Sequence, residues 1–277
     1  MPAEGTIAGN YIPLSEGESM NDMGVQTSAA PAPQASGLTQ WQRVADTFVA
    51  PQKTFDDIKR GNRSWWLPFL ISLLLGTFLW STVGQEVTWR GVYENNQRNL
   101  PEFAKRLMEN MTPEQKAKQE QAGPISQEIT WAIAPLGVLI IDLVAAAVLL
   151  GTINFGFGGK ANFGSVFAVT LYAGLVLWPI KLVLGSIALY AGALPDAFDP
   201  RNPAGTNLGY YLSRQDTPLW LYTLATNFDV LSIWCLVLTS IGVAAVAGTR
   251  RSSGYIAVFG WWAIFMALSL GLAAIFS

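Results

Sequence analysis

The sequence predicts an all-α, polytopic integral membrane protein with five transmembrane helices. Five long apolar stretches support this prediction, since each meets or approaches the roughly 20 helical residues that cross a hydrocarbon core of about 30 Å. Composition agrees, because 51% of the 277 residues are hydrophobic and only 13% are charged, against about a quarter in soluble domains. The expected spans are residues 65–83, 129–154, 165–193, 219–247 and 255–276.

The first 38 residues are predicted to be a disordered tail. Residues 28–37 are small, polar and rich in proline, so they bury too little apolar surface to offset the entropy lost on ordering. No Lys or Arg precedes Arg43, which argues against a cleavable signal peptide. We therefore expect the first span to act as its own signal anchor.

Residues 39–64 are predicted to form two short amphipathic helices in the headgroup region. Apolar residues recur at near-helical spacing in the first of them, at Trp41, Val44, Phe48 and Val49. Gln40, Arg43 and Asp46 lie elsewhere, and the helix is expected to end before Pro51. Thr54 is expected to cap the second helix, whose first turn holds Asp56 and Asp57. Either the pair anchors the first span in the interface, or it forms a docking surface for a partner.

The connection after the first span predicts an external helical hairpin over about residues 95–123. One helix is expected to begin at Pro101. The second begins where Thr112 provides a cap, Pro113 the first helical position and Gln115 the capping-box partner. A Gly-Pro pair at 123–124 is expected to end this helix.

Basic residues beside the spans indicate the orientation. They gather before the first span and after the fourth, at Lys53, Lys59, Arg60, Arg63, Arg250 and Arg251. The positive-inside rule then favours a cytoplasmic N-terminus and an external C-terminus. The hairpin loop carries basic residues of its own, so the bias between the two sides is small.

Three ionisable residues within the expected spans are the candidate site: Asp142, Lys181 and Asp229. Each lies about ten to thirteen residues, or roughly 15–20 Å, from the external end of its span, so the three are expected to share one depth. Pro179 lacks an N–H and is expected to bend the third span beside Lys181. The group is interpreted as a proton-binding or cation-binding site, as a structural ion pair, or as Lys181 reaching outward to the headgroups.

Several classes of chemistry are excluded by composition. The chain has no histidine and a single cysteine, Cys235, which lies among apolar residues. Intramolecular disulfides, Cys/His zinc sites, haem ligation by histidine and nucleophile–histidine relays are therefore excluded. No basic stripe of the kind that binds nucleic acid is present. We expect no enzymatic activity, no cofactor, no metal and no nucleic-acid partner.

Short motifs along residues 40–276 resemble bacterial members of the YIP-domain family. They lie at residues 43–48, 54–58, 65–68, 158–163, 167–173, 233–234, 241–243 and 248–251. The resemblance implies a five-span helical domain with a cytoplasmic N-terminus. Eukaryotic members bind Rab-type GTPases and serve vesicle traffic. The Asp-Leu-Tyr-Gly-Pro segment of those members is missing here, and the proline expected early in the third span is displaced to Pro179. The GTPase-binding role is therefore not transferred.

The predicted function is that of a non-catalytic membrane scaffold or adaptor in the bacterial inner membrane. Its expected partners are the lipid bilayer and another membrane protein or a second copy of the chain. The alternative is a small transporter or channel that uses Asp142, Lys181 and Asp229. Whether the polar residues line a water-filled path would distinguish the two.

Overall fold

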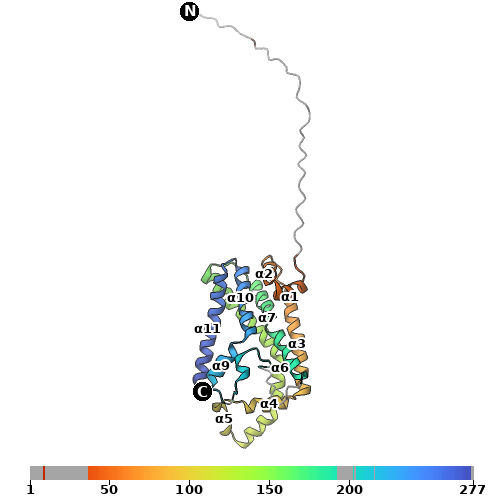
Figure 1. Cartoon of the computed structure of the whole chain (residues 1–277), viewed down its shortest axis with the longest axis vertical. Coiled ribbons are helices and arrows are strands. Elements are labelled where there is room, and N and C mark those ends of the chain that lie inside the picture. Colours follow the sequence, from red (N-terminus) through yellow and green to blue (C-terminus); the bar gives the residue numbers. More distant parts are fainter. Residues whose placement is uncertain (1–8, 10–36, 192–201, 203, 215, 276–277) are drawn as a thin grey trace, which may run out of the picture. The chain divides into compact units, whose positions relative to one another are not determined.

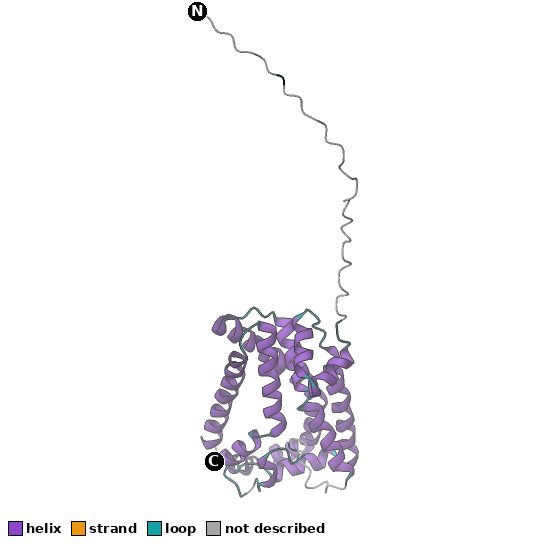
Figure 2. Ribbon diagram, turned by 45° about the horizontal axis from the view of Figure 1, so that its top comes forward, coloured by secondary structure: helices purple, strands orange, loops and turns teal. Residues whose placement is uncertain are grey.

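A computed structural model describes residues 9, 37–191, 202, 204–214 and 216–275. The predicted disordered tail therefore lies outside the described residues, except at positions 9, 37 and 38. The described chain is helical and contains no strand (Figure 2). Five of its helical segments are long and apolar enough to cross a membrane. The predicted fold class, an all-α membrane protein with five spans, is confirmed.

The five spans run through one bundle (Figure 1). The first is α3, Trp66–Glu86, and the second is the apolar part of α6, Pro113–Gly151. Helices α7, Phe163–Gly174, and α8, Trp178–Tyr190, together form the third. The last two are α10, Val230–Ala247, and α11, Arg251–Ile275.

Helix α7 is the centre of the core. Every residue from Ser165 to Ala173 is buried, whereas only five of the 25 residues of α11 are. The α7 side chains pack against buried residues of α6, α10 and α2 in one apolar cluster. Hydrocarbon side chains gain little by leaving lipid for this cluster, so close packing is what holds it together.

The two N-terminal helices pack into the same bundle (Figure 1). They are α1, Gln40–Val49, and α2, Pro51–Lys59. Phe55 and Ile58 of α2 are fully buried in the core cluster, and Gly242 of α10 provides space for Phe55. Side chains of α2 thus reach the interior of the bundle as well as its surface.

Two expectations for this region were wrong. Thr54 is no cap: it lies inside α2, which begins at Pro51, and its hydroxyl donates to the carbonyl of Arg43 at 2.9 Å. Arg43 does not face water either, since it is only 1% exposed. Its Nη1 donates to the carbonyls of Asn62 and Ser64, and the Asp57 carboxylate balances its charge, while Nε is buried without a hydrogen-bond acceptor among the described residues.

The second and third spans are antiparallel and joined by a tight link. Helix α6 ends in a π-helical turn, Thr152–Gly156, and Gly158 has a φ of 68°, a conformation that favours glycine. The Asn154 side chain then donates to and accepts from the backbone of Ala161, at 2.9 Å in both cases. These bonds fix the reversal before α7 begins.

The opposite end of the bundle carries the short helices α4, Trp89–Arg98, and α5, Glu102–Glu109. Here the prediction that the Gly123-Pro124 pair ends a helix was wrong, because α6 continues unbroken through both residues. The absent side chain of Gly123 lets the Tyr93 ring of α4 lie directly against α6. Packing along α4 and the Thr112 capping box stabilise the helix beyond the hydrogen bond lost at Pro124.

The stretch predicted as the fourth span, residues 219–247, is divided into two helices. The first is α9, Leu219–Asn227, and the second is α10, with Asp229 between them. Asp229 accepts from the backbone N–H of Ser232 at 3.0 Å and so caps α10. Thr226, Asn227 and Asp229 interrupt the apolar stretch too briefly for a hydropathy average over a whole span to reveal the break.

The third span breaks where Pro179 was expected to bend it. Residues 175, 176 and 177 each donate their backbone N–H to the carbonyl three positions earlier, which is a tighter turn than an α-helix makes. Helix α8 then starts at Trp178 with Pro179 in its first turn, a position that needs no proline N–H. Lys181 follows within the same turn.

Candidate functional site

The structure brings Lys181 and Asp229 into an ion pair. The Lys181 ammonium nitrogen lies 3.0 Å from Asp229 Oδ2. The Asp229 side chain is 1% exposed and that of Lys181 is 20% exposed. The pair therefore joins the start of α8 to the start of α10 inside the protein.

Hydrogen bonds to the Asp229 carboxylate complete this site. Oδ2 also accepts from the Thr206 hydroxyl at 2.6 Å and from the Asn207 amide at 3.4 Å, while Oδ1 accepts from Ser232 N–H. Burial alone would raise the pKa of Asp229. The hydrogen bonds from Thr206, Lys181 and Ser232, with the charge of Lys181, outweigh burial and hold this pKa below its ordinary value of 3.8.

The segment before α9 supplies two of these donors by folding back onto α10. Asn207 forms an isolated antiparallel bridge with Asp229, and Val230 N–H donates to the Thr206 carbonyl at 3.0 Å. Asn207 also caps the short 3₁₀ helix η3, Leu208–Tyr211. The sequence did not indicate Thr206 or Asn207 as site residues, because nothing local marks a polar loop that turns inward.

Asp142 is placed apart from the Lys181–Asp229 pair. It has no ion-pair or hydrogen-bonding side-chain partner among the residues that the structure describes. It lies nine residues before the end of α6, about 14 Å along the helix, whereas Lys181 lies eighteen residues into the third span, about 27 Å. Asp142 instead lines a cavity of about 110 Å³ between α3, α6, α7 and α8.

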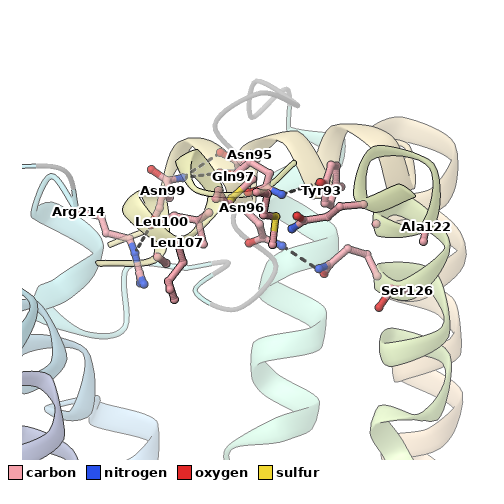
Figure 3. A pocket seen from close by; sticks show the side chains of 16 residues that line it. Tyr93, Asn95, Asn96, Gln97, Asn99, Leu100, Leu107, Ala122, Ser126 and Arg214 are labelled. Carbon is pink, nitrogen blue, oxygen red and sulfur yellow. Dashed lines mark hydrogen bonds between the residues drawn. The ribbon is translucent and has the colours of Figure 1, made fainter. Parts of the chain in front are cut away.

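A larger pocket of about 590 Å³ lies at the end of the bundle that carries α4 and α5 (Figure 3). Amide side chains provide much of its polar surface, at Asn95, Asn96, Gln97, Asn99, Gln119 and Gln127. Arg214 closes one side, where its Nε donates to the Asn99 carbonyl at 2.8 Å. The guanidinium carbon of Arg214 also lies 5.0 Å from the centre of the Tyr222 ring, so Arg214 links this side of the pocket to α9.

A second buried ion pair, between Arg43 and Asp57, was missed by sequence reasoning. Arg43 Nε lies 3.6 Å from Asp57 Oδ2, and both side chains are 1% exposed. Asp57 also accepts from Asn62 Nδ2 at 2.8 Å and from Leu38 N–H at 3.1 Å. The amphipathic pattern of α1 gave the opposite indication, since a charged residue off the apolar stripe ordinarily faces water.

Within the described residues, no group of three or more His, Cys, Asp or Glu side chains is arranged to hold a metal ion. The Asp229 carboxylate of the Lys181–Asp229 pair is enclosed by Thr206, Asn207 and Ser232. The direct chemical consequence of the pair is to neutralise two charges within the protein.

These features define a class: a five-span α-helical membrane protein whose N-terminal helices are packed into the bundle and whose interior holds two ion pairs, Arg43–Asp57 and Lys181–Asp229. The Yip1 domain model matches residues 45–273. The chain therefore belongs to the Yip1 domain family. No curated protein and no solved structure matches it.

Proposed function

We propose that this protein is a non-catalytic membrane scaffold or adaptor that binds a transmembrane helix of a partner along α11. The partner is another membrane protein or a second copy of the chain. The observation that supports this function is the outward face of α11, a full-length span of which only five of 25 residues are buried. In a bilayer, either lipid or a partner helix covers this face.

The outward face of α11 combines large apolar side chains with a row of small ones. The exposed large residues are Ile256, Ile264, Phe265, Leu268, Leu272 and Ile275. Ala263, Ala267 and Gly271 are also exposed and recur every four residues. A Cβ added at Gly260 or Gly271 would meet nothing within 4 Å. Small residues at this spacing allow a second helix to approach closely, which is the usual basis of association in lipid.

The closed state of the Lys181–Asp229 pair favours a scaffold over a transporter. Asp229 has four hydrogen-bonding partners and is 1% exposed, so the carboxylate has little capacity left for an ion. The alternative, a small transporter or channel, is supported by Asp142, which lines a cavity at membrane depth without a cationic partner. The two functions differ in whether charge crosses the membrane.

We place the protein in a bacterial inner membrane with the α1–α2 end in the cytoplasm. Exposed basic residues gather at that end, on α2, on the two tight links and before α3, at Lys53, Lys59, Arg60, Arg63, Lys160, Arg250 and Arg251. Acidic residues there are fewer, and Asp57 is buried against Arg43. The positive-inside rule supports this orientation. Single cysteines at positions 34 and 119 in a Cys235→Ser background, labelled with an impermeant reagent, test it, and equal protection of both sites would contradict it.

Site-specific crosslinking tests the scaffold function. A photoreactive residue at Ala267 should form a discrete protein adduct in native membranes, and the same residue at Ile140, an exposed apolar position of α6, serves as the matched control. Gly271→Leu should abolish the adduct without lowering thermal stability, because that position is open. Absence of any adduct at Ala267 would contradict partner binding on α11.

A flux measurement tests the alternative. The purified chain in liposomes should move protons and alkali cations no faster than empty liposomes do. Flux that is lost in Asp142→Asn or Lys181→Met would overturn the scaffold proposal and establish the transporter.

A further inference from the structure

The cavity beside Asp142 is built from residues of four helices. Ser72 and Gly76 come from α3, Trp131, Pro135 and Asp142 from α6, and Trp178 from the start of α8. Apart from Asp142 and Ser72, the residues that line it are apolar or aromatic. Most of the wall therefore cannot bind a polar molecule, and the Asp142 carboxylate is its dominant polar feature.

The carboxylate has no internal partner to neutralise it. Lys181, the basic residue that the sequence grouped with Asp142, is engaged with Asp229 at 3.0 Å. Asp142 itself makes no ion pair or side-chain hydrogen bond within the described part of the chain. An ionised carboxylate among apolar groups is unfavourable unless a proton or another cation neutralises it.

Aromatic rings in the same wall suit an organic cation. Phe69, Trp131 and Trp178 line the cavity with Asp142. A positive charge is attracted both by a carboxylate and by the faces of aromatic rings, of which tryptophan is the strongest. A metal ion would need several oxygen ligands, and no group of three acidic or other metal-ligating residues is present within the described residues.

The size of the cavity restricts the ligand further. An apolar cavity of about 150 Å³ holds a benzene-sized molecule, so one of about 110 Å³ accommodates a small alkylammonium group and excludes a whole lipid. Trp178 is 43% exposed, so an apolar tail can extend past the cavity edge. The ligand therefore carries its charge on a small head attached to an apolar body.

We propose that the cavity between α3, α6, α7 and α8 binds the ammonium group of a lipophilic amine through Asp142 and the neighbouring tryptophans. This binding goes beyond the scaffold function and does not depend on a partner at α11. The amine is either the headgroup of an aminophospholipid or a free amphiphile, and both present the same chemistry to Asp142.

Equilibrium binding to the full chain in nanodiscs of phosphatidylglycerol, which carries no ammonium group, tests the proposal. The probe is butyltrimethylammonium, and its uncharged isostere 2,2-dimethylhexane is the matched ligand control. Saturation-transfer NMR on the trimethyl protons, corrected for empty discs, should show saturable binding of the cation and at least tenfold weaker binding of the isostere.

Two variants separate the charge from the cavity. Asp142→Asn should weaken binding of the cation at least tenfold. Asp216→Asn removes an exposed acid that does not line the cavity, so it should leave this binding unchanged. Gly76→Val keeps the charge but fills the cavity, because a Cβ there would lie 3.8 Å from Pro135 Cγ and 3.9 Å from Leu182 Cδ1, and it should also abolish binding. Since Gly76→Val leaves Asp142 intact, it tests the site even if Asp142→Asn does not fold.

Competition by an aminophospholipid identifies the source of the amine. If phosphatidylethanolamine in the discs competes with the probe, the headgroup is the ligand; if it does not, a free amphiphilic amine is. Equal binding of the probe to wild type and Asp142→Asn, equal binding of the isostere, or no saturable binding above empty discs would each overturn the proposal.

Discussion

The guanidinium carbon of Arg43 lies 5.1 Å from the centre of the Tyr172 ring. This contact joins α1 to the last turn of α7, where the Tyr172 ring is fully buried. Arg43 also donates to the carbonyls of Asn62 and Ser64, at 2.7 and 3.2 Å, which lie just before α3. One side chain thus connects the N-terminal helices, the first span and the central helix.

Replacing Arg43 is expected to destabilise the bundle strongly. Arg43→Ala removes a buried ion-pair partner of Asp57, and such a change costs about 3 kcal/mol. Arg43→Lys should recover only part of the loss, because an ammonium lacks the planar fork that reaches several carbonyls. The free energy of unfolding, measured by circular dichroism during titration of detergent micelles with SDS, reports the difference.

Arg60→Ala is the matched control for this change. Arg60 also pairs with Asp57, at 3.2 Å, but its side chain is 63% exposed, and exposed pairs contribute less than about 1 kcal/mol. If Arg43→Ala were no more destabilising than Arg60→Ala, the buried contact would have no special structural role.

A double-mutant cycle on Lys181 and Asp229 should show coupling. Lys181→Met leaves Asp229 buried without its cation, and Asp229→Asn removes the charge that Lys181 neutralises. The double variant should therefore be less destabilised than the sum of the two single changes, by at least about 1 kcal/mol. SDS-induced unfolding again provides the free energies.

The same cycle with Asp142→Asn in place of Asp229→Asn tests the separation of Asp142 from the pair. The effects of Asp142→Asn and Lys181→Met should add to within about 0.5 kcal/mol. Coupling of 1 kcal/mol or more would restore the three-residue network that the sequence suggested.

The fold could be predicted from sequence because bilayer thickness acts on every span independently. A stretch such as 255–276 needs only its own length and hydropathy to be recognised. The breaks within spans are harder to predict from the sequence. Pro179 signals one of them through its missing N–H, whereas the break at Asp229 depends on a distant loop that brings Thr206 to the carboxylate.

The candidate site was less predictable because side-chain pairing depends on how helices rotate and how deep each residue lies. Lys181 and Asp229 form an ion pair, whereas Asp142, which was grouped with them from its spacing along the sequence, lines a separate cavity. Arg43 shows the opposite error. Its charge predicts a solvent-exposed position. Its burial depends on the carbonyls of residues 62 and 64, which lie about twenty positions later in the sequence.

Acid should weaken the contribution of Asp229. Its pKa in the folded protein is lowered from the ordinary value of 3.8, so the stabilisation is complete above that value and is lost as the pH falls through the lower, folded-state value. The stability difference between wild type and Asp229→Asn should therefore be constant from pH 7 to about 5 and shrink below about 4. Thermal unfolding in detergent between pH 3 and 7 measures it, and a difference that grew in acid would contradict the assigned direction.

Two glycines of α11 should respond in opposite ways to the same substitution. A Cβ at Gly254 would collide with the backbone carbonyl oxygen of Ser240 and lie 3.0 Å from Ala244 Cβ, whereas one at Gly260 would meet nothing within 4 Å. Gly254→Ala must push α11 away from α10, which should cost about 1–3 kcal/mol. Gly260→Ala adds a methyl group to an open face and removes a flexible residue from a helix, so it should be neutral or stabilising by up to about 1 kcal/mol. Melting temperatures of the two variants in one detergent decide the matter, and equal loss of stability in both would mean that the close contact between α10 and α11 does not support the bundle.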